Sequence, residues 1–214
     1  MLFGVPNCTR MGQSAVVFTC GEPSLQAQRR LWGLARIART WPHVRETVTG
    51  AGNLTLNFDR HAVSCDALAA RLLETWERAD AFVPPAHTIE IPLRYGGEDG
   101  PDLHDVARVC GLSSSEVIER HAASVYVVAF LGFVPGFGYL DGLDPKLHVP
   151  RRAQPRTRVP AGSVAIAGSQ SAVYPLESPG GWQVIGRTLL RMFDPGREPF
   201  ALLEPGDSVR FVRQ

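Results

Sequence analysis

Residues 163–185, SVAIAGSQSAVYPLESPGGWQVI, decide the fold of the second half of this 214-residue chain. Their apolar runs are short and of β type, and turns that contain glycine or proline separate them. Glycine and proline residues interrupt the chain in the same way before and after this stretch, from Gly132 onward. Many short strands joined by turns are typical of a closed barrel or a sandwich. The strands expected in this half span residues 163–167, 172–174, 182–185, 189–193 and 208–212.

The stretch before Gly132 adds two strands and two short helices. Residues 88–92 alternate between apolar and polar side chains, and residues 125–130 form a continuous apolar run of β type. Between these runs, the loop at 95–102 leads into a helix that should end near Gly111. Ser113 and Glu116 have the spacing of a capping box, which predicts the start of a second helix.

The first 80 residues predict a small α+β unit. Residues 15–19, 44–49 and 54–58 have strand character, and the last of these runs alternates strictly. Two helical patterns begin after Ser24 and Ser64, which are favourable N-cap residues. This order suggests two helices packed on one face of an antiparallel sheet. The stiff pair Pro84-Pro85 then marks a boundary between a domain of residues 1–85 and a domain of residues 86–214.

The composition fits a globular protein and excludes several classes of partner. Apolar residues make up 44% of the chain and charged residues 20%, which permits a core and excludes wholesale disorder. The net charge of +1 gives no basic field for nucleic acid, and no apolar run approaches the length of a membrane span. The start of the chain lacks a signal-peptide pattern, and the four cysteines have no C-x-x-C spacing. We therefore expect a cytoplasmic protein with free thiols that binds neither nucleic acid nor membranes.

Familiar catalytic and metal-binding motifs are missing from the sequence. The six histidines include no i, i+4 pair and no standard spacing to an acid or a cysteine, so no metal is predicted. The single lysine, Lys146, lies outside any phosphate-binding P-loop. Ser163 and Ser178 lie beside turns, and turn chemistry explains them better than a nucleophilic role. The sequence therefore leaves the catalytic residues unknown.

Residues 150–160, PRRAQPRTRVP, hold four arginines in eight positions within a frame of three prolines. The prolines keep the segment extended. Guanidinium groups match the oxygens of carboxylates, carbamates and phosphates. The segment is thus an anion site or a surface for an acidic partner, or else a solvated basic strip or a set of internal ion pairs. Composition alone does not decide between these interpretations.

Two glycine-rich segments carry aromatic side chains, GFVPGFGYL at 132–140 and SPGGW at 178–182. Glycine permits positive φ angles and a close approach of the backbone. A Pro-Gly-Gly turn followed by Trp182 can expose an aromatic face at the rim of a pocket. A tight barrel corner with Trp182 in the core is the competing interpretation.

The second half of the chain contains a series of short motifs that follow one another in a definite order. They are Tyr95-Gly96-Gly97-Glu98, Gly100-Pro101-Asp102-Leu103, Gly132-Phe133, Pro135-Gly136-Phe137, Tyr139-Leu140, Gly142-Leu143, Pro150-Arg151, Pro155-Arg156-Thr157-Arg158-Val159-Pro160-Ala161-Gly162-Ser163-Val164, Gly168, Gln170, Tyr174-Pro175, Ser178-Pro179-Gly180-Gly181-Trp182 and Gly186-Arg187-Thr188. Over about residues 88–214 this pattern resembles the B-type subunit of the bacterial ATP-dependent 5-oxoprolinases. That family is also called Kip-type kinase inhibitor or allophanate hydrolase subunit 1. It corresponds to subdomains C and D of the carboxyltransferase part of urea carboxylases.

The first 80 residues resemble the family in layout only. Gly12-Gln13 stands where the family has a Gly-Asp pair, and residues 1–11 look like an added start. Leu189 stands where the family commonly has proline. Neither departure removes the expected pocket residues, and the first bears on partner contacts of the first domain.

The resemblance implies a fold, an activity and a set of partners. The fold would be an α+β N-terminal domain followed by a mostly-β, cyclophilin-like barrel, with no implication of prolyl isomerase activity. The chain would join a C-type subunit, the other half of the carboxyltransferase module, and a LamB/YcsF-type subunit. That complex would open 5-oxo-L-proline, its small-molecule substrate, to L-glutamate with ATP hydrolysis. ATP would be used by the complex, and this chain would be inactive alone.

Two other functions remain open from the sequence. One is a carboxyltransferase or allophanate-hydrolase subunit that acts on a urea-like substrate through the same barrel. The other is a regulatory module that inhibits a histidine kinase. Neither has a motif that separates it from the oxoprolinase function.

The expected site is an anion-binding mouth of the barrel. Arg156 and Arg158 are two residues apart, so their side chains share a face of an extended segment. Arg152 has the same parity and Arg151 the opposite one, and only the family motif places Arg151, rather than Arg152, behind them. In the opposing interpretation these arginines are internal struts that pair with acids such as Asp141 or Glu177. The expected substrate- or anion-binding residues are Tyr139, Arg151, Arg156, Arg158, Gln170, Tyr174 and Trp182.

Overall fold

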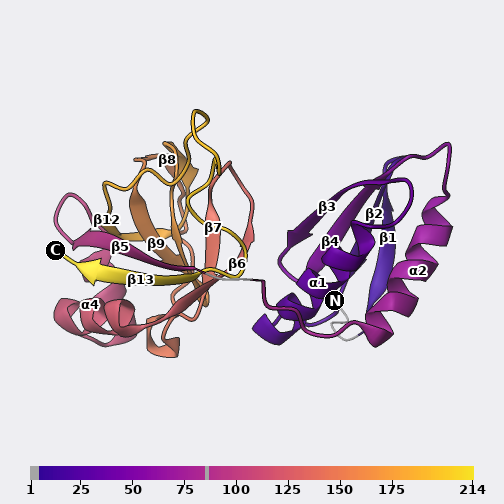
Figure 1. The fold of residues 1–214 in the computed structure, drawn as a ribbon. Coiled ribbons are helices and arrows are strands. Elements are labelled where there is room, and N and C mark those ends of the chain that lie inside the picture. Colours follow the sequence, from indigo (N-terminus) through magenta and orange to yellow (C-terminus); the bar gives the residue numbers. More distant parts are fainter. Residues whose placement is uncertain (1–4, 85–86) are drawn as a thin grey trace. The chain divides into compact units, whose positions relative to one another are not determined.

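Residues 5–84 and 87–214 are described by a computed structural model, which divides into two units, Met1–Pro84 and Pro85–Gln214 (Figure 1). The first unit holds a four-stranded antiparallel sheet with the strand order β1-β2-β4-β3. Its strands are β1 (Asn7–Met11), β2 (Ala15–Thr19), β3 (Val44–Gly50) and β4 (Asn53–Phe58), and its helices are α1 (Leu25–Ala38) and α2 (Cys65–Arg78).

Strict alternation in β4, together with Val16 and Phe18 of β2, gives the sheet one apolar face, and both helices pack on that face. The buried side chains on it are Val16, Phe18, Leu54, Leu56 and Phe58, and they share one core with residues of α1 and α2. Each helix begins where the sequence predicts, because the Ser24 and Ser64 hydroxyls accept hydrogen bonds from backbone N–H groups three residues further on.

Strand β1 corrects the expectation for the start of the chain. Asn7–Met11 pairs antiparallel with β2, from Asn7↔Thr19 to Met11↔Ala15, so these residues belong to the sheet rather than to an added start. The strand is mostly exposed and polar, and no apolar alternation marks it in the sequence. The backbone of β2 provides the pairing instead. Residues 1–4 lie outside the described residues.

The second unit is a closed barrel of seven strands in the order β10-β7-β6-β13-β5-β12-β9 (Figure 1). The neighbouring strands are antiparallel except for β5 and β13, which run parallel from Thr88↔Ser208. The expected order, an α+β unit followed by a barrel, is confirmed. The barrel strands are β5 (Thr88–Tyr95), β6 (Tyr126–Leu131), β7 (Gly138–Asp141), β9 (Ser163–Ala167), β10 (Gln170–Val173), β12 (Gln183–Arg187) and β13 (Ser208–Arg213).

Short helices and one small extra sheet complete this unit. Helix α3 (Leu103–Cys110) ends at Gly111, whose φ of +65° is the left-handed conformation that stops a helix. Helix α4 (Ser114–Ala123) begins with the expected capping box of Ser113 and Glu116. A 3-10 turn, η1, spans Pro145–Leu147, and β8 (Arg156–Val159) pairs with β11 (Ser178–Gly180) outside the barrel.

The strand expected at residues 189–193 is wrong. Leu189 is 78% exposed, and of residues 189–193 only Met192 is buried in the barrel core. Phe193 makes only an isolated bridge to Ala201. Among the described residues, no helix combines the length and the apolar character that a membrane crossing requires.

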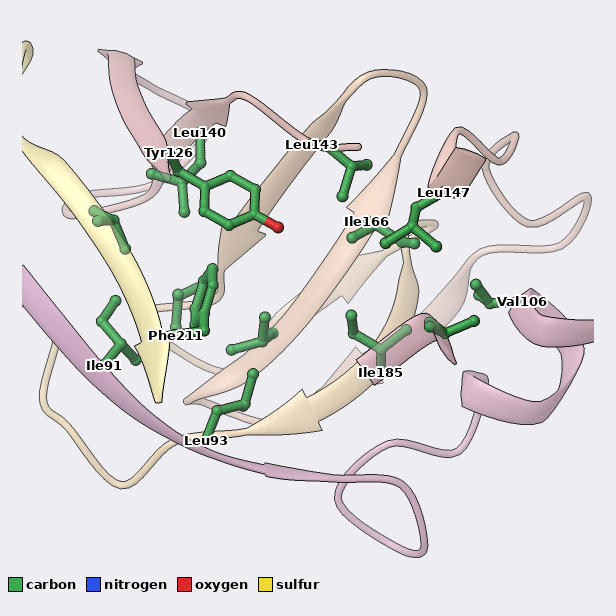
Figure 2. Packing of buried hydrophobic residues seen from close by; sticks show 14 of the residues in the cluster. Ile91, Leu93, Val106, Tyr126, Leu140, Leu143, Leu147, Ile166, Ile185 and Phe211 are labelled. Carbon is green, nitrogen blue, oxygen red and sulfur yellow. The ribbon is translucent and has the colours of Figure 1, made fainter. Parts of the chain in front are cut away.

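Large apolar side chains fill the barrel. Figure 2 shows Ile91 and Leu93 of β5 facing Phe211 of β13, with Tyr126 and Leu140 nearby and Ile166, Ile185 and Val106 further along the same core. All of these side chains are buried. Val106 comes from α3, so this helix covers one opening of the barrel core.

A chain of three polar groups is buried beside this apolar core. The Ser171 hydroxyl donates to the Ala165 carbonyl at 3.3 Å, which leaves its oxygen free to accept from Nε2 of His121 at 3.0 Å. Nδ1 of His121 then accepts from the Tyr95 hydroxyl at 2.7 Å. Burial lowers the pKa of His121 to about 3, so this imidazole is neutral and part of the packing.

Candidate functional site

A buried carboxylate, Asp102, organises the arginine-rich segment. Asp102 stands at the N-cap position of α3, but its side chain makes no capping hydrogen bond. It accepts instead from Nη1 of Arg152 at 2.6 Å, from both Nη atoms of Arg156 at 2.7 Å, and from the Val184 N–H at 2.7 Å. The side chain is 2% exposed. The buried charge is therefore fully paired, and the segment is fastened to the barrel wall.

The four arginines of this segment have different electrostatic surroundings. Arg152 and Arg156 share Asp102, and Arg158 pairs with Glu177 at 2.6 Å on the surface. Arg151 has no carboxylate partner among the residues that the structure describes. Its guanidinium lies 5.9 Å from the ring centroid of Trp182. Arg151 is thus the one of the four whose guanidinium contacts no acid in the described chain, whereas Arg152 and Arg156 share a single carboxylate.

The backbone on both sides of Arg151 is held in place. The Arg152 N–H donates to the Gly181 carbonyl at 2.7 Å, and the Gln183 side chain donates to the Pro150 carbonyl at 3.1 Å. Arg152 is fixed again by Asp102. The position of Arg151 therefore follows from contacts made by its neighbours.

Arg151 borders a small pocket with aromatic walls, which we call the aromatic pocket. The cavity has a volume of about 110 Å³ and contains no acidic residue in its lining. Phe137 lies at the centre of the wall, with ring centroids 4.9 Å from Tyr139, 5.3 Å from Tyr174 and 5.9 Å from Trp182. The lining residues are Phe133, Phe137, Tyr139, Arg151, Tyr174, Pro179, Gly180, Gly181 and Trp182.

Small residues beneath the rings make room for this pocket. Ala165, Ala167 and Ala172 on β9 and β10 pack under Phe137, Tyr174 and Trp182 in a cluster separate from the main barrel core. Gly180 lies so close to the Tyr174 hydroxyl that a Cβ atom there would collide with it. The Trp182 backbone also lies close enough to this hydroxyl to lower its pKa. These contacts fix the tyrosine and the tryptophan relative to each other.

The electrostatics of the aromatic pocket favour an anion. Burial raises the pKa of both Tyr139 and Tyr174, while the nearby Arg151 opposes this shift. Both phenols are therefore neutral at ordinary pH. A pocket with one unpaired guanidinium and neutral aromatic walls is suited to a small anion with an apolar body.

A second cavity, of about 350 Å³, lies between α3 and residues 149–154. It is larger, but each arginine in its lining already contacts an acid, since Arg108 pairs with Asp105 and Arg152 shares Asp102 with Arg156. We therefore take the aromatic pocket as the candidate site. The larger cavity is lined by Asp105, Val106, Arg108, Val109, Val149, Pro150, Arg152, Ala153, Gln154 and Gln183.

The structure brings four of the seven residues expected at the site into the aromatic pocket: Tyr139, Arg151, Tyr174 and Trp182. The other three lie elsewhere. Arg156 is bound to Asp102, Arg158 pairs with Glu177, and Gln170 donates to Asp141 at 2.8 Å. Among residues 5–84 and 87–214, no three His, Cys, Asp or Glu side chains come together in a group that could hold a metal ion.

Sequence reasoning did not single out Asp102 or Phe133 as functional. Asp102 occurs in a turn motif before a helix, where an aspartate is ordinarily a helix cap. Its role as the shared partner of two arginines depends on contacts 50 and 54 residues away along the chain. Phe133 belongs to a glycine-rich aromatic segment, but nothing in the sequence shows that its ring is exposed at a pocket.

The class of this protein is defined by a small α+β unit followed by a closed barrel that carries an arginine-bearing aromatic pocket. Residues 6–203 match the family described as the carboxyltransferase domain, subdomain C and D. The chain belongs to this family.

Known relatives and solved structures agree with this assignment. The chain is 50% identical over 210 residues to the B-type subunit of 5-oxoprolinase from Escherichia coli O157:H7, covering 97% of this chain and 96% of that protein. The crystal structure of TTHA0988 is similar with a TM-score of 0.79 and 40% identity, covering 94% of this chain and 40% of the longer one. The Kluyveromyces lactis urea amidolyase, at 21% identity, has a TM-score of 0.81 over the whole of this chain and 15% of that enzyme, and shows the fold alone.

Proposed function

We propose that this chain is the B-type subunit of an ATP-dependent 5-oxoprolinase complex, which opens the lactam of 5-oxo-L-proline to give L-glutamate. The observation that carries the proposal is the 50% identity, over nearly the full length of both chains, to the 5-oxoprolinase protein of Escherichia coli O157:H7. The aromatic pocket supports it, because its single unpaired cation suits a small organic acid.

The chain contributes part of the reaction, in this proposal, and its partners contribute the rest. It has one lysine, which lies outside any P-loop, and ATP is used by the complex as a whole. The expected partners are a C-type subunit and a LamB/YcsF-type subunit. The relation to TTHA0988 supports a partner, since this chain corresponds to only 40% of that polypeptide. The location proposed for the complex is the cytoplasm.

The overall reaction adds water across the lactam C–N bond and hydrolyses ATP to ADP and phosphate. Negative charge develops on the lactam oxygen as the ring opens. A fixed cation in a pocket with little water stabilises such charge more strongly than water does. Arg151 is exposed at the aromatic pocket, so in this proposal it holds the substrate, and the partner subunits stabilise the charge on the lactam oxygen.

The test is reconstitution from purified proteins. The chain alone is expected to release no ADP in response to 5-oxo-L-proline, whereas the chain with the C-type and LamB/YcsF-type subunits should release ADP and L-glutamate together. Turnover by the chain alone would contradict the division of labour. A complete mixture that is inactive with 5-oxo-L-proline but active with a urea-like substrate would favour the carboxyltransferase function instead.

A further inference from the structure

Phe133 has an unusual backbone conformation. Its φ angle is +65°, and the Val134 N–H donates to the Gly132 carbonyl at 2.8 Å, which closes a three-residue γ-turn around it. Phe133 and His43 are the two non-glycine residues with positive φ that are recorded in the described part of the chain. A γ-turn of this hand is rare and strained, and bulky residues adopt it seldom.

The strain is not compensated by burial of the phenyl ring. Phe133 is 60% exposed at the rim of the aromatic pocket. It touches the wall edge-on, with its centroid 5.4 Å from that of Phe137 and 6.5 Å from that of Tyr174. A strained backbone that displays an exposed aromatic ring at a pocket is typical of a ligand-binding position.

Phe133 and Arg151 give the aromatic pocket two complementary features. One is an apolar ring whose exposed surface is available for contact, and the other is a guanidinium without a carboxylate partner in the described chain. The cavity of about 110 Å³ is smaller than the ~150 Å³ cavities that enclose benzene, so it accepts one small ring that projects partly into solvent.

We propose that the aromatic pocket binds a small flat ring that carries one carboxylate, with the carboxylate on Arg151 and the ring against Phe133. This assignment rests on the proposed function, under which the ligand is 5-oxo-L-proline, a five-membered lactam acid. A neutral amide lacks the charge for Arg151. Free phosphate has the charge but no apolar body to cover Phe133.

The test measures equilibrium binding of 5-oxo-L-proline to the assembled complex by calorimetry without nucleotide. Arg151→Gln and Phe133→Ala should each weaken binding about tenfold or more, because each removes one of the two recognition features. The matched controls are Arg210→Gln, an exposed arginine on β13, and Phe200→Ala, an exposed phenylalanine outside the pocket. Both controls should bind like the wild type.

Phe133→Gly separates recognition from folding. Glycine relieves the strain at positive φ, so this variant should have a melting temperature at or above that of Phe133→Ala while binding stays weak. A residue with a purely structural role would not combine retained thermal stability with lost affinity. Wild-type affinity in Phe133→Gly would overturn the role of the ring.

Ligand analogues test the carboxylate assignment. The wild type should bind 5-oxo-L-prolinamide about tenfold or more weakly than the acid, and Arg151→Gln should bind the two equally. Competition by orthophosphate at concentrations similar to those of the acid would assign the cation to phosphoryl groups and overturn the proposal. If the wild-type complex turns over 5-oxo-L-proline and the variants keep its affinity, this inference fails while the proposed function stands. If the wild-type complex is inactive, the proposed function fails.

Discussion

The two units bury different kinds of side chain. Among the described residues, the first unit buries one polar side chain, Gln28, within a core of alternating aliphatic and aromatic residues. The second unit buries six polar or charged side chains, namely Asp102, His121, Ser163, Ser171, Thr188 and Asp207. The first unit is thus specified by apolar periodicity. The barrel depends also on polar groups that hold its loops.

The buried carboxylates of the barrel show what these polar groups do. Asp102 fastens the arginine segment, and Asp207 accepts from the backbone N–H groups of His87 and Glu204 at 2.9 Å each. Both acids tie irregular segments to strands. The aromatic pocket lies among such segments, so its geometry depends on polar contacts that the first unit does not need.

The largest expected effect comes from Asp102→Ala. The change leaves the guanidinium groups of Arg152 and Arg156 without their partner, and losing one member of a buried ion pair costs about 3–5 kcal/mol. Native-state hydrogen exchange should show this loss in barrel peptides and no change in peptides of the first unit. Asp66→Ala, at an aspartate whose side chain is 92% exposed, is the control. If Asp102→Ala lowers the free energy of unfolding of the barrel by less than about 1 kcal/mol, the barrel does not depend on its buried polar groups in the way described above.

The second-largest expected effect concerns the apolar core of the first unit. Leu56→Ala removes a buried aliphatic side chain from β4 and should destabilise this unit by about 3 kcal/mol, through lost burial and the cavity left behind. Val48→Ala on the neighbouring strand β3, where the side chain is half-exposed, should cost far less. Hydrogen exchange of the peptides at 15–19 and 53–58 measures the effect. Equal losses in the two variants would show that alternation does not specify this sheet.

The third prediction uses pH. Burial lowers the pKa of His121 to about 3, from 6.5 in an unfolded chain. Below pH 6.5 the unfolded chain takes up a proton that the folded barrel does not, so stability falls as pH falls. The slope approaches about 1.4 kcal/mol per pH unit well below pH 6.5, and the change between pH 6.5 and 4.5 is about 2.3 kcal/mol. Urea unfolding of the wild type and of His121→Gln at both values should show this difference. Parallel profiles would contradict a neutral, buried His121.

The smallest effect concerns a helix cap. Ser113→Ala removes the hydroxyl that accepts from the Glu116 N–H at 3.2 Å, and should cost about 1 kcal/mol in the barrel. Ser113→Thr keeps a hydroxyl and should recover most of this. Hydrogen exchange at α4 is the measurement. A loss as large as that of Asp102→Ala would mean that α4 is more important for the barrel than its surface position suggests.

The parts of the fold that the sequence predicts are those with local signals. The N-caps at Ser24 and Ser64 and the strand Ser163–Ala167 are found where composition and spacing place them. The sequence does not predict strands β1, β7, β8 and β11, because their residues are polar or include proline or glycine. Such strands exist through pairing with a partner far away in sequence, which a single sequence does not show.

The same limit applies to the candidate site. The sequence drew attention to the arginine segment as an anion site, but four similar residues cannot be ranked without knowing which acids face them. Asp102 and Glu177 engage three of the arginines and leave Arg151 at the aromatic pocket. Parity along an extended segment grouped Arg156 with Arg158, whereas the structure gives them different acids.

The parallel pairing of β5 with β13 has a consequence for how the protein is made. β13 begins at residue 208 and β5 at residue 88, so the strand that closes the barrel follows its partner by 120 residues. At roughly 5–20 residues per second, a ribosome needs about 6–24 s to synthesise that stretch. The first unit pairs strands that are close in sequence and has all of them available early. During those seconds the backbone N–H and C=O groups on one edge of β5 have no partner strand. An unpaired strand edge can pair with other chains, so the nascent barrel needs this edge to be covered until β13 is made.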